Sequence, residues 1–203
     1  MRSRQNGDRS RLAIVERGLA LTAQGGRHRA SIGALAQTLG MSKSAVHAHF
    51  GSKGALDAAL VEAAAERFDQ AVLRPAGAAP PGLARLAALC EAFVQYVAAP
   101  AGPPLTPAHR AFGRGMGVAA ESRLRTWAET WRQALESAAA QAVVQGELAA
   151  TADPAQVAFE LGVLLDGAGR RLDIAAPEDV VRRVRTAVDR TLLGWSPGGF
   201  AVT

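Results

Sequence analysis

Residues 31–56 contain two short helical patterns separated by a glycine, and no other stretch of the chain constrains the fold as strongly. Apolar residues recur there at the spacing of one helix face, on both sides of the glycine: Ile32, Leu35, Ala36, Leu39, Val46 and Phe50. Ser31 and Ser42 stand where a hydroxyl caps the first turn of a helix, and Gly40 suits the left-handed backbone that ends one. The pattern predicts a helix-turn-helix whose second helix starts after Ser42, ends near Phe50 and is about two turns long.

Positive charge is concentrated at the same end of the chain. The 203 residues have a net charge of +5, but the stretch up to Lys53 contains nine Lys or Arg and two acids, a net charge of +7. The remainder has a net charge of −2. A basic head on a mildly acidic body is expected when one end of a protein binds a polyanion. The alternative is a solvated basic face without a partner, which the helix-turn-helix pattern disfavours.

Cysteine content and apolar segments indicate the compartment. Cys90 has no second cysteine with which to form an internal disulfide, and we expect it to be a small apolar core residue. No segment reaches the ~18 consecutive apolar residues of a membrane span, and no apolar run follows the N-terminal arginines. These features predict a cytoplasmic protein that does not bind a membrane.

Helical periodicity, proline and glycine divide the chain into four parts. These are a flexible basic arm, a helix-turn-helix head, a connecting helix with a linker, and a helical body: 1–9, 10–54, 55–82 and 83–203. The first helix of the head is expected to start near Ser10. Three prolines and two glycines between Arg74 and Gly82 are expected to end the connecting helix at about Leu73. No stretch alternates as a strand does, so the predicted fold class is all-α.

Residues 14–56 resemble the DNA-binding head of the TetR family of transcriptional regulators. The matching residues stand at the family's spacing: Gly26, Ser31, Ile32, Leu35, Ala36, Leu39, Gly40, Met41, Ser42, Lys43, His49, Phe50, Ser52, Lys53, Ala55 and Leu56. The resemblance implies a three-helix head followed by a ligand-binding and dimerisation bundle at 83–203. It further implies a homodimer that binds a palindromic operator in double-stranded DNA, usually as a repressor, and leaves it when a small-molecule ligand binds. No residue excludes activation.

The chain departs from the family pattern at two positions of the head. Arg27 follows Gly26 at a position where family members commonly have an aromatic residue. His47 stands where a tyrosine that touches a phosphate is usual. Histidine still donates to a phosphate oxygen, although its side chain is shorter. These two positions are where phosphate contacts or operator preference are expected to differ.

The second helix of the motif supplies the expected base contacts. Val46 and Phe50 must face the core, which leaves the outward-facing positions for the major groove: Lys43, Ser44 and His47. Three further residues are expected to contact phosphates: Ser31, His49 and Lys53. Ser31 and Lys53 begin helices, where free N–H groups and the helix dipole favour an anion. For His49, an equally weighted alternative is a partly buried histidine that braces the turn.

His47 and His49 also raise the question of a metal site. Residues two apart on a helix point about 200° apart, so both cannot bind one ion from a regular helix. No cysteine or acid stands beside them. We therefore expect neither a metal nor a cofactor.

The body contains candidates for a ligand pocket and for a protomer contact. Aromatic and polar side chains on its central helices are candidates for the pocket lining, with ordinary core packing as the alternative for each: Phe93, Tyr96, His109, Phe112, Met116, Trp127, Trp131 and Phe159. The homodimer contact is expected through the last two helices, about residues 155–194, where Gly162 and Gly167 permit close helix packing. The alternative there is an intrachain core.

Two other functions are alternatives to a sequence-specific regulator. An enzyme is disfavoured because the sequence has no nucleophile elbow, phosphate loop, metal-ligand set or paired carboxylates on one helix face. A structural protein that binds DNA without sequence preference remains an alternative. It predicts affinity that falls with salt to the same degree on any sequence.

Overall fold

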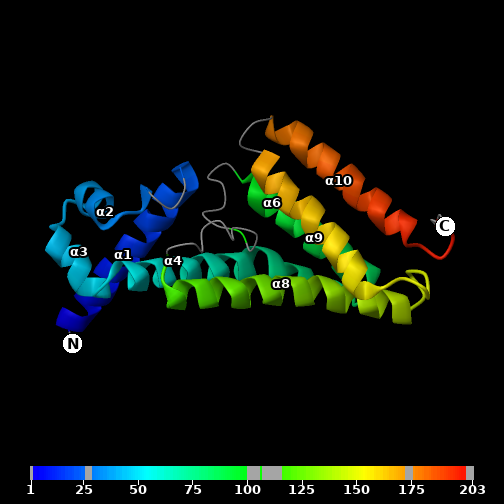
Figure 1. The fold of residues 1–203 in the computed structure, drawn as a ribbon, viewed down its shortest axis with the longest axis horizontal. Helices are drawn as coiled ribbons and strands as arrows, with labels where there is room; N and C mark the ends of the chain where they lie inside the picture. The colour runs from blue at the N-terminus through cyan, green and yellow to red at the C-terminus, as the bar shows by residue number, and fades with distance from the viewer. Residues whose placement is uncertain (1, 26–28, 100–105, 107–115, 172–175, 200–203) are drawn as a thin grey trace. The chain divides into compact units, whose positions relative to one another are not determined.

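The structure, a computed structural model, describes residues 2–25, 29–99, 106, 116–171 and 176–199, and there the chain forms helices and no strands (Figure 1). In chain order the elements are α1 (Arg2–Gly25), α2 (Ile32–Leu39), α3 (Lys43–Phe50), α4 (Lys53–Phe68), a π-helical segment (Asp69–Leu73), α5 (Arg74–Gly77), α6 (Leu83–Ala98), α8 (Val118–Val144), α9 (Pro154–Arg171) and α10 (Pro177–Gly194). The predicted all-α class is confirmed. None of these helices combines the length and apolar content that a membrane span needs.

The chain divides into two compact units, each described by itself. The first consists of Met1–Arg67 together with Ala101–Trp127, and so holds α1, α2, α3, most of α4 and the start of α8. The second consists of Phe68–Pro100 together with Ala128–Thr203. Most of α8 therefore belongs to the second unit.

The first helix is longer than the sequence predicts. The predicted start near Ser10 is wrong, because α1 begins at Arg2 and most of the predicted arm at 1–9 is helical. The residues from 2 to 9 include no proline. Once a helix exists, each residue added to its end gains one backbone hydrogen bond, which offsets the cost of about 1 kcal/mol for Gly7.

The ends of α2 and α3 follow the predicted signals. The Oγ atoms of Ser31 and Ser42 accept hydrogen bonds from the third backbone N–H that follows each, at 3.2 and 3.0 Å. Gly40 ends α2 in the left-handed conformation, with φ of 63°. Gly51 ends α3 with φ of 73°. The predicted limits of α3 and the capping serines are confirmed.

A core of aliphatic side chains holds the helices of the first unit together. Its fully buried members come from α1, α2, α3 and α4: Ile14, Leu19, Leu35, Val46, Leu56 and Leu60. A Cβ atom added to Gly18 would lie only 2.6 Å from Cδ2 of Leu60, so α1 passes close to α4 at this glycine. This core fixes one side of α3 and leaves the other side to solvent.

The helix after α4 extends beyond its predicted end. We expected it to stop at about Leu73, but the chain stays helical to Gly77, so this prediction is wrong. A proline ring in a regular α-helix clashes with the carbonyl four residues earlier. The wider π-helical segment before Pro75, in which the Arg74 N–H donates to the carbonyl of Asp69, accommodates the ring. The chain leaves the helix only after Gly77.

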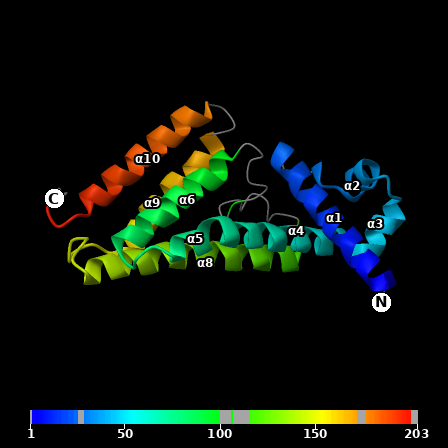
Figure 2. The same cartoon turned by 180° about the vertical axis from the view of Figure 1, so that it is seen from behind.

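In the second unit, α6, α9 and α10 pack against one another, as both views of the ribbon show (Figures 1 and 2). Polar contacts tie these helices across long stretches of sequence. The Arg185 guanidinium of α10 donates to both Glu91 oxygens of α6, at 2.5 and 2.8 Å. Trp195 Nε1 donates to Glu160 of α9 at 2.9 Å. Because these partners are distant in sequence, the contacts fix how the three helices pack.

Cys90 lies in the core of the second unit, on α6, with 2% of its surface exposed. The predicted core placement is confirmed. Burial and, to a smaller extent, the neighbouring Glu91 carboxylate raise the pKa of the thiol to about 12. The reactive thiolate is therefore scarce at neutral pH.

Candidate nucleic-acid interface and aromatic cluster

The outer face of α3 presents the residues predicted to contact bases. Lys43, Ser44 and His47 are exposed, whereas Val46 is fully buried and Phe50 has 9% of its surface exposed. The predicted division of α3 into a core face and an outward face is therefore confirmed. Contact of these three side chains with bases remains a prediction.

Neighbouring groups restrain two of these side chains. The Ser44 hydroxyl lies 2.9 Å from that of Ser42, within the first turn of α3. A Cβ atom added to Gly33 would lie 3.5 Å from Cε of Lys43, so the Lys43 side chain extends over the first turn of α2. The Lys43 and Ser44 side chains lie where α2 and α3 meet, and these contacts restrict their rotamers before any DNA binds. This restriction lowers the conformational entropy lost on binding.

The predicted phosphate contacts have different surroundings. Ser31 is half-buried and uses its oxygen to cap α2, which leaves the hydroxyl proton to donate. Lys53 is ion-paired with Asp57, whose side chain is 1% exposed. His49 is half-buried, which is compatible with both a phosphate contact and a bracing role. A Lys53 that contacts a phosphate would therefore share its charge with a buried carboxylate.

Arg11 of α1 contacts the end of α3, which the sequence did not predict. Its Nη1 donates to the backbone carbonyl of His49 at 2.7 Å. Its guanidinium carbon lies 4.3 Å from the centre of the Phe50 ring. A signal was present, because Arg11 stands one helical turn before the buried Ile14 and therefore at the edge of the packed face of α1.

Four aromatic residues form a cluster in the second unit. The Phe68 ring meets three others edge to face, those of Phe93, Tyr96 and Trp131, with centroids 6.0, 5.4 and 5.3 Å away. Phe93 and Trp131 stack with their centroids 5.3 Å apart. Three of the predicted pocket residues are thus brought together. Phe68, which joins them, is not among the predicted pocket residues, and its helical spacing to Leu60 and Ala64 signals only a buried face.

Trp131 combines burial with a polar atom that no group satisfies. Trp131 is 5% exposed, and its Nε1 is buried without a hydrogen-bond partner among the residues that the structure describes. A buried donor without a partner costs about 1–3 kcal/mol, so such groups call for an explanation. A ligand that carries a hydrogen-bond acceptor would remove this cost.

The other predicted pocket residues are distributed differently. Met116 and Trp127 are buried in the first unit, with 2% and 5% of their surfaces exposed. His109 and Phe112 lie outside the described residues. Phe159 is 64% exposed on α9, so the expectation that it faces an interior pocket does not agree with its position. Phe159 lies two residues from both Val157 and Leu161, which are buried, and helical periodicity therefore places its side chain on the opposite, exposed face of α9.

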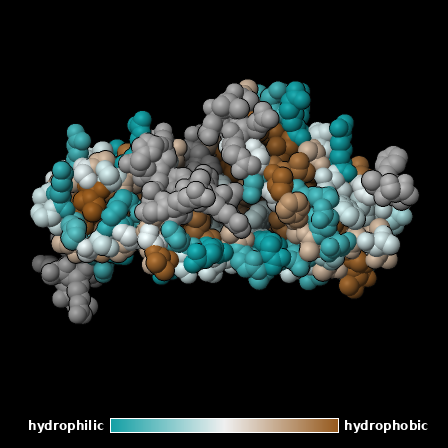
Figure 3. Space-filling view, viewed as in Figure 1, coloured by the Kyte–Doolittle hydropathy of each residue, from teal (hydrophilic) through white to brown (hydrophobic). Residues whose placement is uncertain are grey.

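Exposed apolar side chains lie on the last two helices. Phe159 and Val163 on α9 and Leu193 on α10 have 64%, 53% and 67% of their surfaces exposed. Phe159 and Val163 are one turn apart and share a face of α9. Figure 3 shows hydrophobic surface over the region where α9 and α10 run side by side.

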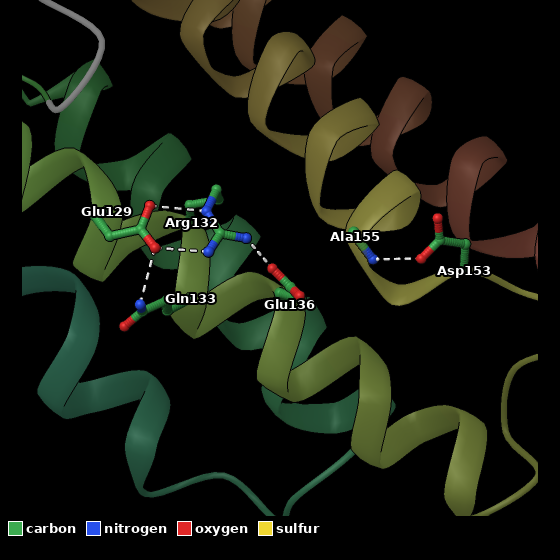
Figure 4. A network of polar contacts seen from close by, with 6 residues as sticks. All are labelled: Glu129, Arg132, Gln133, Glu136, Asp153 and Ala155. Carbon is green, nitrogen blue, oxygen red and sulfur yellow. Dashed lines mark hydrogen bonds and ion pairs between the residues drawn. The ribbon is translucent and has the colours of Figure 1, made fainter.

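A polar groove of about 400 Å³ lies between α8 and the start of α9. Figure 4 shows that Arg132 donates to both Glu129 and Glu136 there, and that Gln133 also donates to Glu129. Hydrogen bonds from Arg132 hold the pKa of Glu129 down at about 2, and Glu129 in turn raises the pKa of Arg132. The arginine that lines this groove is therefore already ion-paired with two carboxylates of its own helix.

Comparison with protein families finds two models that match the chain. Residues 14–64 match the model of bacterial regulatory proteins of the tetR family. Residues 82–188 match the model described as "Tetracyclin repressor-like, C-terminal domain", and this match alone covers more than half of the chain. No curated protein sequence matches the chain.

Solved structures show the same fold at low sequence identity. A TetR-family transcriptional regulator from Agrobacterium tumefaciens has a TM-score of 0.80 at 17% identity, over 91% of this chain and 98% of that one. A TetR regulator from Chloroflexus aurantiacus has a TM-score of 0.75 at 21% identity, over 91% and 96%. AibR in complex with isovaleryl coenzyme A and operator DNA has a TM-score of 0.73 at 19% identity, over 94% and 99%.

Proposed function

The chain belongs to the TetR family and is a DNA-binding transcriptional regulator rather than an enzyme, and we propose that it is a repressor released from a palindromic operator by a small molecule. The outer face of α3 supports the DNA-binding half of this proposal most directly. The orientation of that face is fixed because Val46 and Phe50 are buried on the other side of α3 and Ser42 caps its start. The outer face exposes polar groups suited to base edges. Regulators of this family bind DNA and ligand and dimerise.

On this proposal, α3 enters the major groove with its outer residues on base edges: Lys43, Ser44 and His47. The phosphates on either side are bound by a second group: Ser31, His49 and Lys53. A two-fold symmetric dimer places two such helices on half-sites about one turn of DNA apart, which requires a palindrome. Arg27, the other departure from the family pattern, lies outside the described residues.

The proposed dimer contact lies on α9 and α10. Three exposed apolar side chains there, Phe159, Val163 and Leu193, would be covered by the same helices of a second protomer. Isolated exposed apolar side chains are common, but a shared face on adjacent helices favours an interface. Replacing Phe159 with Glu is expected to give monomers in sedimentation at micromolar concentration, whereas Val144→Glu, at an exposed site on α8, is expected to leave the dimer intact. A dimer that survives Phe159→Glu would contradict this assignment.

The proposed ligand is an uncharged, largely apolar molecule with a hydrogen-bond acceptor. Phe68, Phe93 and Trp131 offer apolar ring surfaces, and Trp131 Nε1 offers a donor without a partner. The structure of AibR with isovaleryl coenzyme A and operator DNA supports ligand binding as a property of this fold. The chemical class proposed here rests on the aromatic cluster alone.

Two probes of nearly equal shape test the ligand proposal. Acetophenone has a carbonyl acceptor, and α-methylstyrene replaces that oxygen with a methylene group. Isothermal titration calorimetry is expected to show that the wild-type protein binds acetophenone about tenfold more tightly than α-methylstyrene. A tenfold ratio corresponds to the free energy of one hydrogen bond to a buried donor. Trp131→Phe should abolish this preference while retaining the aromatic wall. If Trp131→Phe retains the wild-type preference for acetophenone, or if the wild-type protein does not bind acetophenone, the proposal is wrong.

Selection of bound sequences from random DNA tests the regulator. A palindrome bound about 10³-fold more tightly than random DNA is expected, whereas a structural DNA-binding protein would select no sequence. His47→Ala should weaken binding to the selected duplex by about 5–100-fold and relax preference at one position of each half-site. A reporter gene placed behind the selected palindrome then separates repression from activation.

A further inference from the structure

Helix α3, the second helix of the helix-turn-helix, is short. It has eight residues, a length at which an isolated helix is marginal in water. Val46 and Phe50 anchor one side, and Ser42 caps the start. The carbonyl of His49 lies in the last turn, where donors from within the helix are no longer available. Arg11 of α1 supplies the donor that this end of the helix lacks.

Arg11 uses two features of its side chain at once. One N–H donates to the His49 carbonyl at 2.7 Å, and the guanidinium lies over the Phe50 ring at 4.3 Å. A planar guanidinium serves both contacts in one rotamer, whereas the ammonium of lysine offers no plane to stack. Its positive charge also lies at the C-terminal end of α3, where the helix dipole favours a cation. Phe50 is largely buried, so the ring is a fixed platform.

We propose that Arg11 is a positioning residue for sequence recognition. It sets the angle of α3 against α1 through the His49 carbonyl and the Phe50 ring, and it does not itself bind DNA. Base contacts need side chains held within about 0.5 Å, whereas phosphate attraction tolerates larger shifts. Loss of the Arg11 contacts should therefore weaken specific binding more than general binding. This inference rests on the DNA-binding function of the head.

The rival role for an exposed arginine in a basic head is direct contact with a phosphate. The two roles predict different results when lysine replaces Arg11. A phosphate contact requires positive charge, which lysine retains, and its loss lowers the salt dependence of binding by about one charge. A positioning contact requires the planar fork and leaves the salt dependence unchanged.

The experiment uses the full-length protein and two DNA duplexes. One is the 30-base-pair duplex that the wild-type protein selects most strongly from random DNA, and the other is a shuffled duplex of the same composition. Dissociation constants are measured by fluorescence anisotropy at several KCl concentrations for Arg11→Lys and Arg11→Ala. Arg9→Ala is the matched control, because Arg9 is exposed two residues earlier on the same helix. Circular dichroism melting checks that each variant is folded.

Arg11→Lys and Arg11→Ala are both expected to lose about tenfold in affinity for the selected duplex, and less than about twofold for the shuffled one. Their salt slopes should equal that of the wild-type protein. Arg9→Ala should weaken binding to both duplexes equally or to neither. Wild-type affinity in Arg11→Lys, or equal losses on both duplexes with a reduced slope, would overturn the positioning role. Failure of the wild-type protein to select any sequence would instead overturn the proposed function and this inference with it.

Discussion

The start of α6 in the body is fixed differently from the helix starts of the head. In the head, α2, α3 and α4 are capped by the serine directly before them, at Ser31, Ser42 and Ser52, whose hydroxyls accept from the third following N–H at 3.0–3.2 Å. In the body, the first N–H of α6 donates to Glu147 at 2.7 Å, across 64 residues. Gly82 precedes α6 with φ of 94° and makes room for that carboxylate. The head specifies its helix starts locally, and the body specifies this one through tertiary contact.

The same difference holds for the side chains that define each unit. The core face of α3 is set by Val46 and Phe50, one turn apart on one helix. The aromatic cluster joins Phe68, Phe93 and Trp131 from three separate parts of the chain. Local patterns depend on helix geometry alone, whereas the cluster depends on how distant helices pack. Substitutions in the aromatic cluster or at the start of α6 should therefore have larger effects than cap substitutions in the head.

The largest effect is expected in the aromatic cluster. Phe93→Ala should lower the free energy of unfolding by about 3–5 kcal/mol, because the side chain is fully buried between Phe68 and Trp131. Urea unfolding followed by far-ultraviolet circular dichroism, at fixed protein concentration, measures it. Val144→Ala, at a site that is 87% exposed, should change it by less than about 0.5 kcal/mol. A loss below about 1 kcal/mol at Phe93 would mean that the cluster does not support the body.

The next effect is expected at the start of α6. Gly82→Ala should cost about 2–4 kcal/mol, because φ of 94° strains any side chain and a Cβ atom would lie 2.3 Å from the Glu147 carboxylate. Gly77→Ala is the matched control, since nothing lies within 4 Å of a Cβ atom at that helical glycine. It should be neutral or stabilising by up to about 1 kcal/mol. Thermal unfolding of both variants provides the comparison, and equal stabilities would contradict the tertiary start of α6.

A smaller effect is expected at the local cap of α3. Ser42→Ala should destabilise the head by about 1 kcal/mol and weaken binding to the selected duplex, because the Ala45 N–H loses its acceptor. Ser42→Asn retains a capping oxygen and should preserve most of the stability. Hydrogen exchange of the α3 amides is the direct measurement. If the alanine variant exchanges no faster than the asparagine variant, the local cap does not hold the helix.

The smallest effect concerns the ion pair between α6 and α10. Hydrogen bonds from Arg185 lower the pKa of Glu91 below its usual 4.5 in the folded protein. The carboxylate therefore adds stability that is fully present above the unfolded pKa and is lost as the pH falls through the folded value. Both side chains are largely exposed, so Glu91→Gln should cost less than about 1 kcal/mol at pH 7. Melting at pH 7 and at pH 3 measures it, and the difference between wild type and variant should shrink at pH 3.

The sequence predicted the parts of the molecule whose signals are local. The capping serines, Gly40 and the two faces of α3 follow from spacing within one or two turns. Two predicted helix limits are wrong. The first helix starts at Arg2 because an existing helix propagates through the polar N-terminal residues, and the helix after α4 continues to Gly77 because a π-helical segment accommodates Pro75. The contacts that Arg11 and Phe68 make depend on which helices lie next to one another. That information is distributed over the whole chain.

Cys90 has a practical consequence for work on this protein. The sequence has one cysteine, and its thiol is buried with a pKa of about 12. An exposed thiolate attacks the double bond of a maleimide reagent, so the buried native thiol should remain unlabelled while the protein is folded. A cysteine introduced on the surface of α3 would then accept a spin label or fluorophore selectively. Two identical labels in a homodimer would report the separation of the two heads directly, with and without ligand.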